Sequence, residues 1–428
     1  MLTRCPVKRL RVRLILCGLF VIYLAAYSSW SGNPFVNWIA VKLNPGDDAP
    51  YETLDLTEKN SSCWKIISGD PDAVENALLT TIANKYNGFT ESDYLNMTRD
   101  CDSFVKTRKY ITFPLSAKER DFPLAYSMVV NENIDMFERL LRGIYAPQNV
   151  YCVHVDRKSP KSFHSAVQAI TSCFPNVYVV GKLESVTYAS WSRVQADLNC
   201  MAELLQSTVP WRYLITVCGK DYPIKTNREI VNGLMAMNGS NIMDSVSPPE
   251  HKQRRWKFHH DVRETVVRTD RKKSPPPIST PMFVGSAYIL VTREFVSILF
   301  VNPEIQEFFK WSEDTYSPDE HIWATLQRMP ELPGSIPYTP RHHWGDAPVL
   351  TRAVKWTFYA GNIAKGALYP PCTGRNHHLI CIYGSGDLHW IVKQKPLFAN
   401  KFDPEVDNTA VQCMEEYVRH RAIHGTGR

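Results

Sequence analysis

Near Phe122 the chain changes from mixed polarity to short apolar runs separated by amphipathic stretches. Runs of about four to eight apolar, β-branched or aromatic residues between turn signals are typical of buried strands. The expected strands are LAYSMVV (124–130), VYCVHVD (150–156), VYVVG (177–181), YLITVCG (213–219) and MFVGSAYILVT (282–292). Together these runs predict a buried sheet.

The stretches between these runs repeat apolar residues at the spacing of a helix. Between the first two expected strands the repeating positions are Ile134, Phe137, Leu141 and Ile144. They predict a crossover helix against the sheet, and two more helices are expected at 159–174 and 190–206. Strands that alternate with helices predict an α/β domain with a nucleotide-binding type of sheet, whose sites lie at the carboxyl ends of the strands.

The residues ahead of this domain differ in character. Residues 31–120 contain turn-rich stretches such as NPGDDAP, which predicts a stem and an N-terminal cap. An apolar stretch from Leu14 to Trp30 has the shortest length that spans a bilayer, and the cations before it leave the N-terminus cytosolic. A cleaved signal peptide is the alternative to an uncleaved signal anchor. The expected division is a cytosolic tail (1–13), a signal-anchor transmembrane helix (14–30), a luminal stem and cap (31–120) and the α/β domain (121–428).

Composition and charge narrow the classes of function. The formal net charge of +6 is small for 428 residues, so nucleic-acid binding gains little support. Sequons at Asn60, Asn96 and Asn238 are consistent with a secretory lumen, although sequons also arise by chance. Nine cysteines follow the apolar stretch without a CxxC pair, which favours disulfides over a zinc site. Because nine is odd, one thiol should stay free.

Several mechanisms lack their motifs. The sequence has no GxxxxGK[ST] phosphate loop, GxGxxG turn, GxSxG elbow or HExxH metal helix. A luminal α/β domain without them suggests a sugar-nucleotide transferase, and many of these bind a divalent ion through Asp-x-Asp. The triplet Asp100-Cys101-Asp102 precedes the first strand, and its cysteine is expected to be crosslinked. No metal site is therefore predicted.

Without a metal, protein cations must stabilise a departing diphosphate. Candidates in the C-terminal stretch are Arg375, His378 and Lys401. Each of them taken singly is more typical of a solvated surface charge. The three residues frame this segment, and a Cys372–Cys381 pair could hold its first part as a rigid loop.

The stretch TYSPDEHIWATLQ (315–327) places two acids beside a proline, ahead of an apolar run typical of a helix. One interpretation is structural: Ser317 would be the N-cap, Pro318 the first helical residue and Glu320 the acid of a capping box. The other is that Glu320 is a catalytic base. The segment alone favours the structural interpretation.

Six stretches in the same order resemble the core 2 and related β1,6-N-acetylglucosaminyltransferases: NVYCVHVD, YASWSRVQADLNCM, CGKDYPIKT, TYSPDEHIWATLQ, CIYGSGDLHW and LFANKFD. The similarity runs from about Cys63 to Cys413. It implies a type II Golgi membrane enzyme with a GT-A-like fold, in which a Rossmann-like mixed sheet is flanked by helices. The implied reaction is an inverting transfer of N-acetylglucosamine (GlcNAc) from UDP-GlcNAc to the C6 hydroxyl of O-linked GalNAc on glycoproteins. No cofactor or divalent metal is implied.

The resemblance also implies the roles of individual residues, with Glu320 as the catalytic base. The implied donor-binding residues are Val129, Val130, Asn131, Asp156, Arg157, Lys158, Tyr188, His378 and Lys401. The implied acceptor-binding residues are Asp244, Lys252, Arg255, Arg341, Trp356 and Phe358. The implied disulfides are Cys63–Cys413, Cys101–Cys173, Cys152–Cys200 and Cys372–Cys381, with Cys218 free.

Four of these positions differ from the family pattern. Asn131 replaces a histidine, Asp244 a glutamate, Phe358 a tyrosine and His378 an arginine. The change at His378 matters most, because histidine titrates near the mildly acidic pH of the Golgi whereas arginine stays charged. Arg375 and His377 in the same stretch are the candidates to replace it. We expect activity to persist with a reduced rate or an altered choice of acceptor.

Two other functions stay open at this point. The four changes motivate a luminal glycan-binding homologue that has lost catalysis. A related luminal transferase with another donor or acceptor is the second alternative, and core 2, core 4 and I-branching acceptors are all compatible with the sequence. Cys5, Cys17 and Cys218 leave a disulfide-linked homodimer open.

Overall fold

The computed structural model describes residues 62–337, 339 and 350–425, which all lie in one compact unit of the chain. The expected membrane span, the sequon at Asn60 and the expected acceptor residue Arg341 lie outside these residues. Among the described residues, no helix is both long enough and apolar enough to cross a bilayer.

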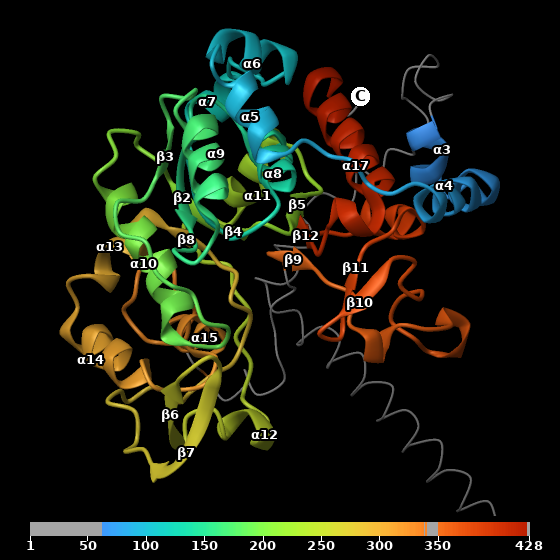
Figure 1. The fold of residues 1–428 in the computed structure, drawn as a ribbon. Coiled ribbons are helices and arrows are strands. Elements are labelled where there is room, and N and C mark those ends of the chain that lie inside the picture. The colour runs from blue at the N-terminus through green and yellow to red at the C-terminus, as the bar shows by residue number, and fades with distance from the viewer. Residues whose placement is uncertain (1–61, 338, 340–349, 426–428) are drawn as a thin grey trace, which may run out of the picture. The chain divides into compact units, whose positions relative to one another are not determined.

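A five-stranded sheet forms the centre of the α/β fold, in the order β3–β2–β1–β4–β8 (Figure 1). Its strands are β1 (Leu124–Val130), β2 (Val150–Val155), β3 (Val177–Val179), β4 (Tyr213–Cys218) and β8 (Leu290–Thr292). The first four are parallel to one another, and β8 pairs antiparallel with β4. The predicted mixed sheet is therefore present, and its parallel strands end at one common edge.

The two faces of the sheet bury different side chains, because successive residues of a strand point to opposite faces. On β1, Tyr126 and Met128 join one core, whereas Ala125 joins the other. The helices that close the first core are α8 (Ile134–Ile144), α9 (Lys161–Thr171) and α11 (Asn227–Ala236). Those that close the second are α10 (Trp191–Leu205), α13 (Arg293–Leu299), α14 (Pro303–Ser312) and α15 (Ile322–Leu326). The crossover helix predicted from Ile134, Phe137, Leu141 and Ile144 is thus confirmed as α8, with these positions buried against the sheet.

A third core brings together segments from both ends of the described chain. Its helices are α3 (Ser62–Ser68), α4 (Pro71–Ala83), α16 (Leu388–Ile391) and α17 (Pro404–His424). A small sheet in the order β5 (Asp221–Pro223), β12 (Phe398–Asn400) and β9 (Arg352–Ala353) joins the same core. The remaining elements are α5 (Glu91–Met97), α6 (Cys101–Thr107), α7 (Ala117–Arg120), α12 (Glu250–Gln253), β6 (Phe258–Val262), β7 (Val266–Lys272), β10 (Arg375–His377), β11 (Ile380–Ile382) and the 3-10 turns η2 (Pro318–Glu320), η4 (Thr357–Tyr359), η5 (Ile363–Lys365) and η6 (Ser385–Asp387).

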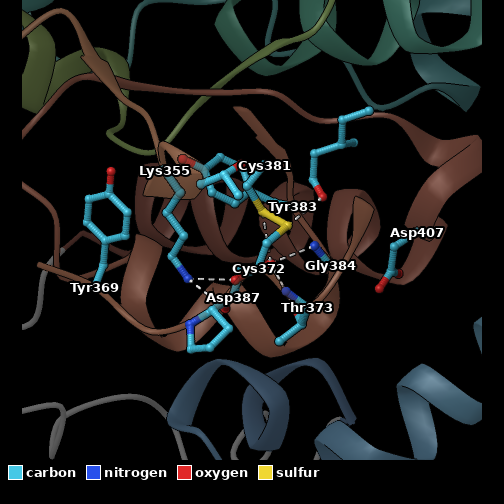
Figure 2. Close-up of a disulfide and its surroundings, with 12 residues drawn as sticks. Lys355, Tyr369, Cys372, Thr373, Cys381, Tyr383, Gly384, Asp387 and Asp407 are labelled. Atoms are coloured by element: carbon cyan, nitrogen blue, oxygen red, sulfur yellow. Dashed lines mark hydrogen bonds and ion pairs between the residues drawn. A yellow bond between two sulfur atoms is a disulfide. The ribbon is translucent and has the colours of Figure 1, made fainter. Parts of the chain in front are cut away.

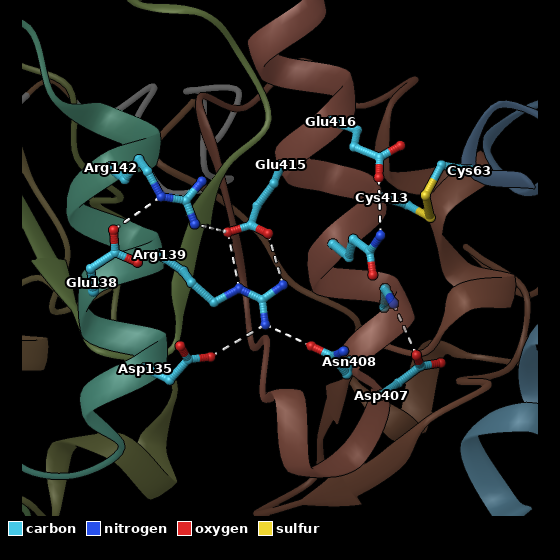
Figure 3. Close-up of polar contacts among 12 residues, drawn as sticks. Cys63, Asp135, Glu138, Arg139, Arg142, Asp407, Asn408, Cys413, Glu415 and Glu416 are labelled. Carbon is cyan, nitrogen blue, oxygen red and sulfur yellow. Dashed lines mark hydrogen bonds and ion pairs between the residues drawn. A yellow bond between two sulfur atoms is a disulfide. The ribbon is translucent and has the colours of Figure 1, made fainter. Parts of the chain in front are cut away.

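A buried charge network fastens α17 to α8 (Figure 3). The guanidinium of Arg139 donates to both carboxylate oxygens of Glu415, at 2.9 and 2.8 Å. Arg142 donates to Glu415 at 2.8 Å and to Glu138 at 3.0 Å. Because Glu415 pairs with both arginines, replacing it would leave two largely buried guanidinium groups without this counter-ion.

Disulfides fasten the first described helices to the α/β domain. Cys63 in α3 is bonded to Cys413 in α17. Cys101 in α6 is bonded to Cys173, which lies just after α9. The described residues that precede β1 are therefore covalently joined to the sheet domain at two points.

Two expectations about the fold are wrong. The strand expected over 282–292 is limited to β8, and its earlier part contributes only a bridge from Val284 to Val246. The disulfide expected between Cys152 and Cys200 is absent, and both residues are buried free thiols. The two thiols are hydrogen-bonded to each other, and burial and this hydrogen bond raise the pKa of the Cys152 thiol.

Candidate active site

The carboxyl end of β1 forms one wall of the candidate site. Val129 is half-buried there, and the carbonyl of the buried Val130 accepts a hydrogen bond from the Asp156 N–H at 2.9 Å. Asn131 is exposed, and its carbonyl accepts from the Ser159 hydroxyl at 2.6 Å. These expected donor residues therefore lie together at the edge where open parallel sheets bind ligands.

The expected donor residues after β2 hold the loop between β3 and α10. The Asp156 carboxylate accepts from the backbone N–H of Lys158 at 2.9 Å and from that of Val186 at 3.3 Å. The Arg157 guanidinium donates to the Leu183 carbonyl at 2.5 Å, and the Lys158 ammonium donates to the Val186 carbonyl at 2.6 Å. All three side chains thus position this loop.

The turn that carries Glu320 is not a capped helix start. Ser317 has a left-handed backbone conformation, with φ of 47°, and its side chain makes no capping hydrogen bond. Its backbone N–H donates to the Ala189 carbonyl at 2.9 Å, so the chain enters the turn from the loop ahead of α10. A 3-10 turn, η2, follows, and α15 begins only after His321. The expected capping box is therefore absent, although Pro318 does open a helical turn directly after Ser317, as expected.

The Glu320 carboxylate faces two cations. Its Oε2 lies 2.5 Å from Arg255 Nη1 and 3.6 Å from Lys252 Nζ. The side chain of Glu320 is 31% exposed, so it is accessible from solvent. The Arg255 guanidinium also lies over the Tyr316 ring, 5.9 Å from its centroid. The implied base and two implied acceptor residues thus come together, although they are far apart in sequence.

Asp244 is joined to this group through Gly285. The Gly285 N–H donates to the backbone carbonyl of Glu320 at 2.9 Å. A Cβ at Gly285 would lie 2.0 Å from the Asp244 carbonyl oxygen, so only glycine permits the approach. Burial raises the pKa of Asp244 to about 6, and the Lys252 ammonium offsets part of this rise. Asp244 therefore lies beside Lys252 and behind the turn of Glu320.

Tyr188 connects the surroundings of Glu320 to the C-terminal cations. Its side chain is 72% exposed, and its ring centroid lies 5.8 Å from that of His378. Desolvation, and then the nearby Tyr316, Glu320 and Asp319, raise the pKa of Tyr188. One exposed ring is thus close both to the implied base and to an implied diphosphate contact.

Cationic and titratable side chains gather beyond Tyr188. Desolvation lowers the pKa of His377, and repulsion from His378, Lys401, Lys220 and Arg375 lowers it further. Burial also lowers the pKa of Lys401, with a contribution from Lys220. We call these five residues the cationic cluster. Such a cluster is chemically suited to an anionic ligand, because its members repel one another when no anion is bound.

Lys220 places the cationic cluster beside the end of β1. Its ammonium lies 3.1 Å from a Glu132 carboxylate oxygen and 3.0 Å from one of Asp403. Next to it, Cys218 is a free thiol as expected, and its sulfur accepts from the Tyr288 hydroxyl at 3.0 Å. Burial raises the pKa of Cys218, which disfavours a reactive thiolate.

The expected aromatic acceptor residues lie on a different segment. Trp356 is 38% exposed and Phe358 is 60% exposed, and their ring centroids are 5.6 Å apart. Trp356 forms a β-bridge with Ile380 in the hairpin of β10 and β11. The two rings are thus tied to the segment of the cationic cluster.

A disulfide and a buried ion pair brace this hairpin (Figure 2). Cys372 is bonded to Cys381, and the fully buried Asp387 carboxylate accepts from Lys355 Nζ at 2.6 Å and from the Gly384 N–H at 2.9 Å. The two sulfurs and the Asp387 carboxylate lie within 4.8 Å of one another. Because both sulfurs are in a disulfide, they are not available as thiolate ligands for a metal.

Two other features of the sequence, the two described sequons and the Asp-x-Asp triplet, lie outside the candidate site. Asn96 and Asn238 are both exposed, as attachment of a glycan requires. Asp100 caps α6 by accepting from the Ser103 N–H at 3.0 Å, and its neighbour Cys101 is in a disulfide. The Asp-x-Asp triplet therefore begins a helix.

Two residues of the site were not selected from the sequence. Burial raises the pKa of Asp319 to about 6, and the nearby Arg193 offsets part of this rise. Arg193 is ion-paired with Asp197, which accepts from the Ser127 hydroxyl on β1 at 2.8 Å. In the sequence, only its position next to Glu320 indicates a role for Asp319. Arg193 falls on the polar face of a predicted amphipathic helix, a position typical of a solvated side chain.

Residues 124–392 match the family model described as Core-2/I-Branching enzyme. The chain belongs to this family. Within the matched residues lie the sheet edge, the turn of Glu320, and His378 in the cationic cluster; Lys401 follows the end of the match.

Curated relatives of this family member extend the similarity over most of the chain. The chain is 54% identical over 382 residues to the Bos taurus beta-1,3-galactosyl-O-glycosyl-glycoprotein beta-1,6-N-acetylglucosaminyltransferase 3. The aligned residues make up 89% of this chain and 87% of the relative. It is 53% identical over 380 residues to the Homo sapiens protein of the same name, and the aligned residues make up 88% of this chain and 87% of the relative. A beta-1,3-galactosyl-O-glycosyl-glycoprotein beta-1,6-N-acetylglucosaminyltransferase of Bovine herpesvirus 4 is 54% identical over 382 residues, with coverage of 89% and 87%.

Proposed function

We propose that this protein is an inverting β1,6-N-acetylglucosaminyltransferase. It transfers GlcNAc from UDP-GlcNAc to the C6 hydroxyl of the GalNAc in core 1 (Galβ1-3GalNAc) O-glycans of glycoproteins, which forms core 2 branches. The names of the relatives support the reaction and the type of acceptor. The observation that carries the proposal is the Glu320 carboxylate, held beside Arg255 and Lys252 and connected through Tyr188 to the cationic cluster.

Glu320 is the general base of the proposed reaction. The acceptor oxygen O6 attacks the anomeric carbon of GlcNAc while the bond from that carbon to the β-phosphate oxygen of UDP breaks. The O6 proton passes to a Glu320 carboxylate oxygen, and UDP leaves with the electron pair of the broken bond. A single displacement converts the α-linked donor into a β-linked product. A carboxylate must be ionised to act as a base, and the two cations beside Glu320 balance its charge.

The cationic cluster takes the role that a divalent ion has in other transferases. Negative charge develops on the diphosphate as it departs, and fixed cations stabilise that charge without reorganising. His378 and Lys401 are the proposed diphosphate contacts, and Arg375 lies in the same cluster. Val129, Asp156 and the loop positioned by it are the proposed site of the uridine moiety.

The acceptor site combines charge and flat apolar surface. Asp244 and Lys252 lie beside the base and are proposed to bind sugar hydroxyls. The exposed indole of Trp356 suits the apolar face of a sugar ring, and Phe358 beside it keeps a ring but has no hydroxyl. We place Arg341 at the acceptor from the resemblance alone.

The test is a transfer reaction with the full chain in detergent. UDP-GlcNAc and a core 1 disaccharide are incubated with and without EDTA, UDP release is measured, and the product linkage is determined. We expect a β1,6 linkage and the same rate with the chelator. UDP release that stops with EDTA would contradict the metal-independent mechanism, and glycan binding without UDP release would favour a catalytically inactive homologue.

The proposal extends to the membrane topology and the compartment of the enzyme. The parallel-rich sheet is consistent with a GT-A-like domain, and the apolar stretch at 14–30 supports a single-pass type II protein with its catalytic domain in the Golgi lumen. Expression with a tag at each end and protease protection of sealed Golgi vesicles test this orientation. I-branching acceptors are the second candidate, because the family name covers I branching.

A further inference from the structure

Residues 250–273 form a basic surface that the proposed reaction uses only in part. This segment contains nine Lys and Arg residues against four Asp and Glu residues, a net charge of +5, whereas the whole chain has +6. It comprises α12 and the hairpin of β6 and β7, which lie next to each other beyond α15 (Figure 1). We call this segment the cationic hairpin. Its charge makes it the strongest candidate for an interaction surface.

Much of this charge is not neutralised within the protein. The exposed members with no carboxylate of the described chain at ion-pair distance are Arg254, Lys257, Arg268 and Lys272. Arg268 lies over the Phe258 ring, 4.9 Å from its centroid, which holds its guanidinium in place without removing its charge. Asp261 is 3.8 Å from Arg263 and 3.7 Å from Arg271, so it partly balances those two arginines instead.

The base of the cationic hairpin is fixed to the segment that carries Glu320. The Asp314 carboxylate is hydrogen-bonded to the His259 ring and ion-paired with Lys273, which lie on the two strand segments at the open end of the hairpin. The Asp314 carbonyl accepts from the His260 N–H at 2.9 Å. Asp314 lies six residues before Glu320. A ligand bound along the hairpin therefore has a defined position relative to the implied base.

We propose that the cationic hairpin binds an acidic polypeptide segment next to the glycosylated serine or threonine of the acceptor. This inference rests on the proposed function and names the class of glycoprotein that the enzyme prefers. A strand of five residues such as β6 is about 16 Å long, so an extended polypeptide leaving the acceptor sugar would pass these cations within several residues. Among the described residues β6 and β7 pair only with each other, so the outer edge of each strand has no partner strand. A free strand edge suits an extended chain.

The test compares two glycopeptides that carry the same core 1 disaccharide. One has Asp and Glu on both sides of the glycosylated threonine, and the other has Asn and Gln at the same positions. KM and kcat are measured with the full chain, and Kd is measured by fluorescence anisotropy without donor. Three exposed ion pairs at about two- to threefold each give a preference of about tenfold for the acidic glycopeptide in KM and Kd. Because exposed charges are screened, the preference should shrink as salt rises from about 0.05 M to about 0.5 M.

A triple charge reversal, Lys257→Glu with Arg268→Glu and Lys272→Glu, should abolish or invert this preference. Its kcat for the free core 1 disaccharide should not change, which shows that the variant is folded. The matched control reverses three exposed cations near α5, α6 and α7, namely Arg99→Glu, Lys106→Glu and Lys118→Glu. The control has the same net charge and should keep the preference.

Each outcome decides one of the two proposals. Equal Kd values for the two glycopeptides, or a preference that survives in the triple variant, would overturn the inference. A third glycopeptide has neutral flanks and a sulfated core 1 glycan, and it tests whether the hairpin binds an anionic glycan instead of an acidic polypeptide. If the triple variant weakens binding of that glycopeptide alone, the ligand is an anionic glycan and the polypeptide inference is wrong. Absence of any GlcNAc product contradicts the proposed function, while the Kd comparison still tests the hairpin.

Discussion

Replacement of Glu320 by glutamine separates catalysis from stability. Glutamine keeps the size of the side chain and can accept a hydrogen bond from Arg255, but it cannot take a proton from the acceptor hydroxyl. General bases contribute about 10²- to 10⁴-fold to rate, which corresponds to about 2.7–5.4 kcal/mol in the activation free energy. We expect kcat of Glu320→Gln to fall within this range.

The same substitution should cost little stability. The carboxylate is partly exposed and interacts with cations at 2.5 and 3.6 Å, and partly exposed pairs contribute about 1 kcal/mol or less to the free energy of unfolding. Thermal unfolding should therefore shift by about 2 °C or less. UDP release with a core 1 acceptor measures the rate, and Glu313→Gln, an exposed acid seven residues earlier, is the control. Full turnover by Glu320→Gln would refute its role as the base.

Three further predictions follow from the site. His378→Arg should raise turnover more at about pH 7.5 than at about pH 6, because arginine stays charged; an unchanged pH profile of kcat would remove the diphosphate role of His378. Asp244→Asn should stabilise the fold near neutral pH and not near pH 4. Burial raises the pKa of Asp244 in the folded state to about 6, above its unfolded value, so ionising Asp244 destabilises the fold as the pH rises between these two values. The loss of stability is at most about 3 kcal/mol. Urea unfolding at both pH values checks this, and equal effects at both would contradict it. Asp387→Asn should lower the free energy of unfolding by about 3–5 kcal/mol, because it leaves the fully buried Lys355 charge unpaired; a loss below about 1 kcal/mol in the same assay would show that the pair is dispensable.

Much of the sheet could be predicted from sequence, because its central strands are continuous apolar runs. The expected run 124–130 coincides with β1, and those at 150–156 and 213–219 match β2 and β4 to within one residue. The run at 282–292 misled because Gly285 lies against the backbone of Asp244, a contact that no local pattern reveals.

The site depended on contacts between distant segments. The resemblance, rather than periodicity, selected Glu320 as the base, and local reasoning gave Ser317 a capping role. A bond from Ser317 to Ala189 instead sets the conformation of the turn, and Tyr188 beside it reaches His378. Sequence spacing carries no information about such pairs. The disulfide expected between Cys152 and Cys200 came from the resemblance alone, and no local pattern in the sequence tells whether two buried cysteines are bonded.

The bond between Cys63 and Cys413 spans 350 residues and orders the biogenesis of the protein. A nascent chain that enters an oxidising compartment exposes Cys63 early and must keep it unreacted until α17 has emerged from the ribosome. The bond between Cys101 and Cys173, with a separation of 72 residues, can close much sooner. A chain that ends between Cys63 and α17 therefore lacks the partner of Cys63 and cannot form this bond.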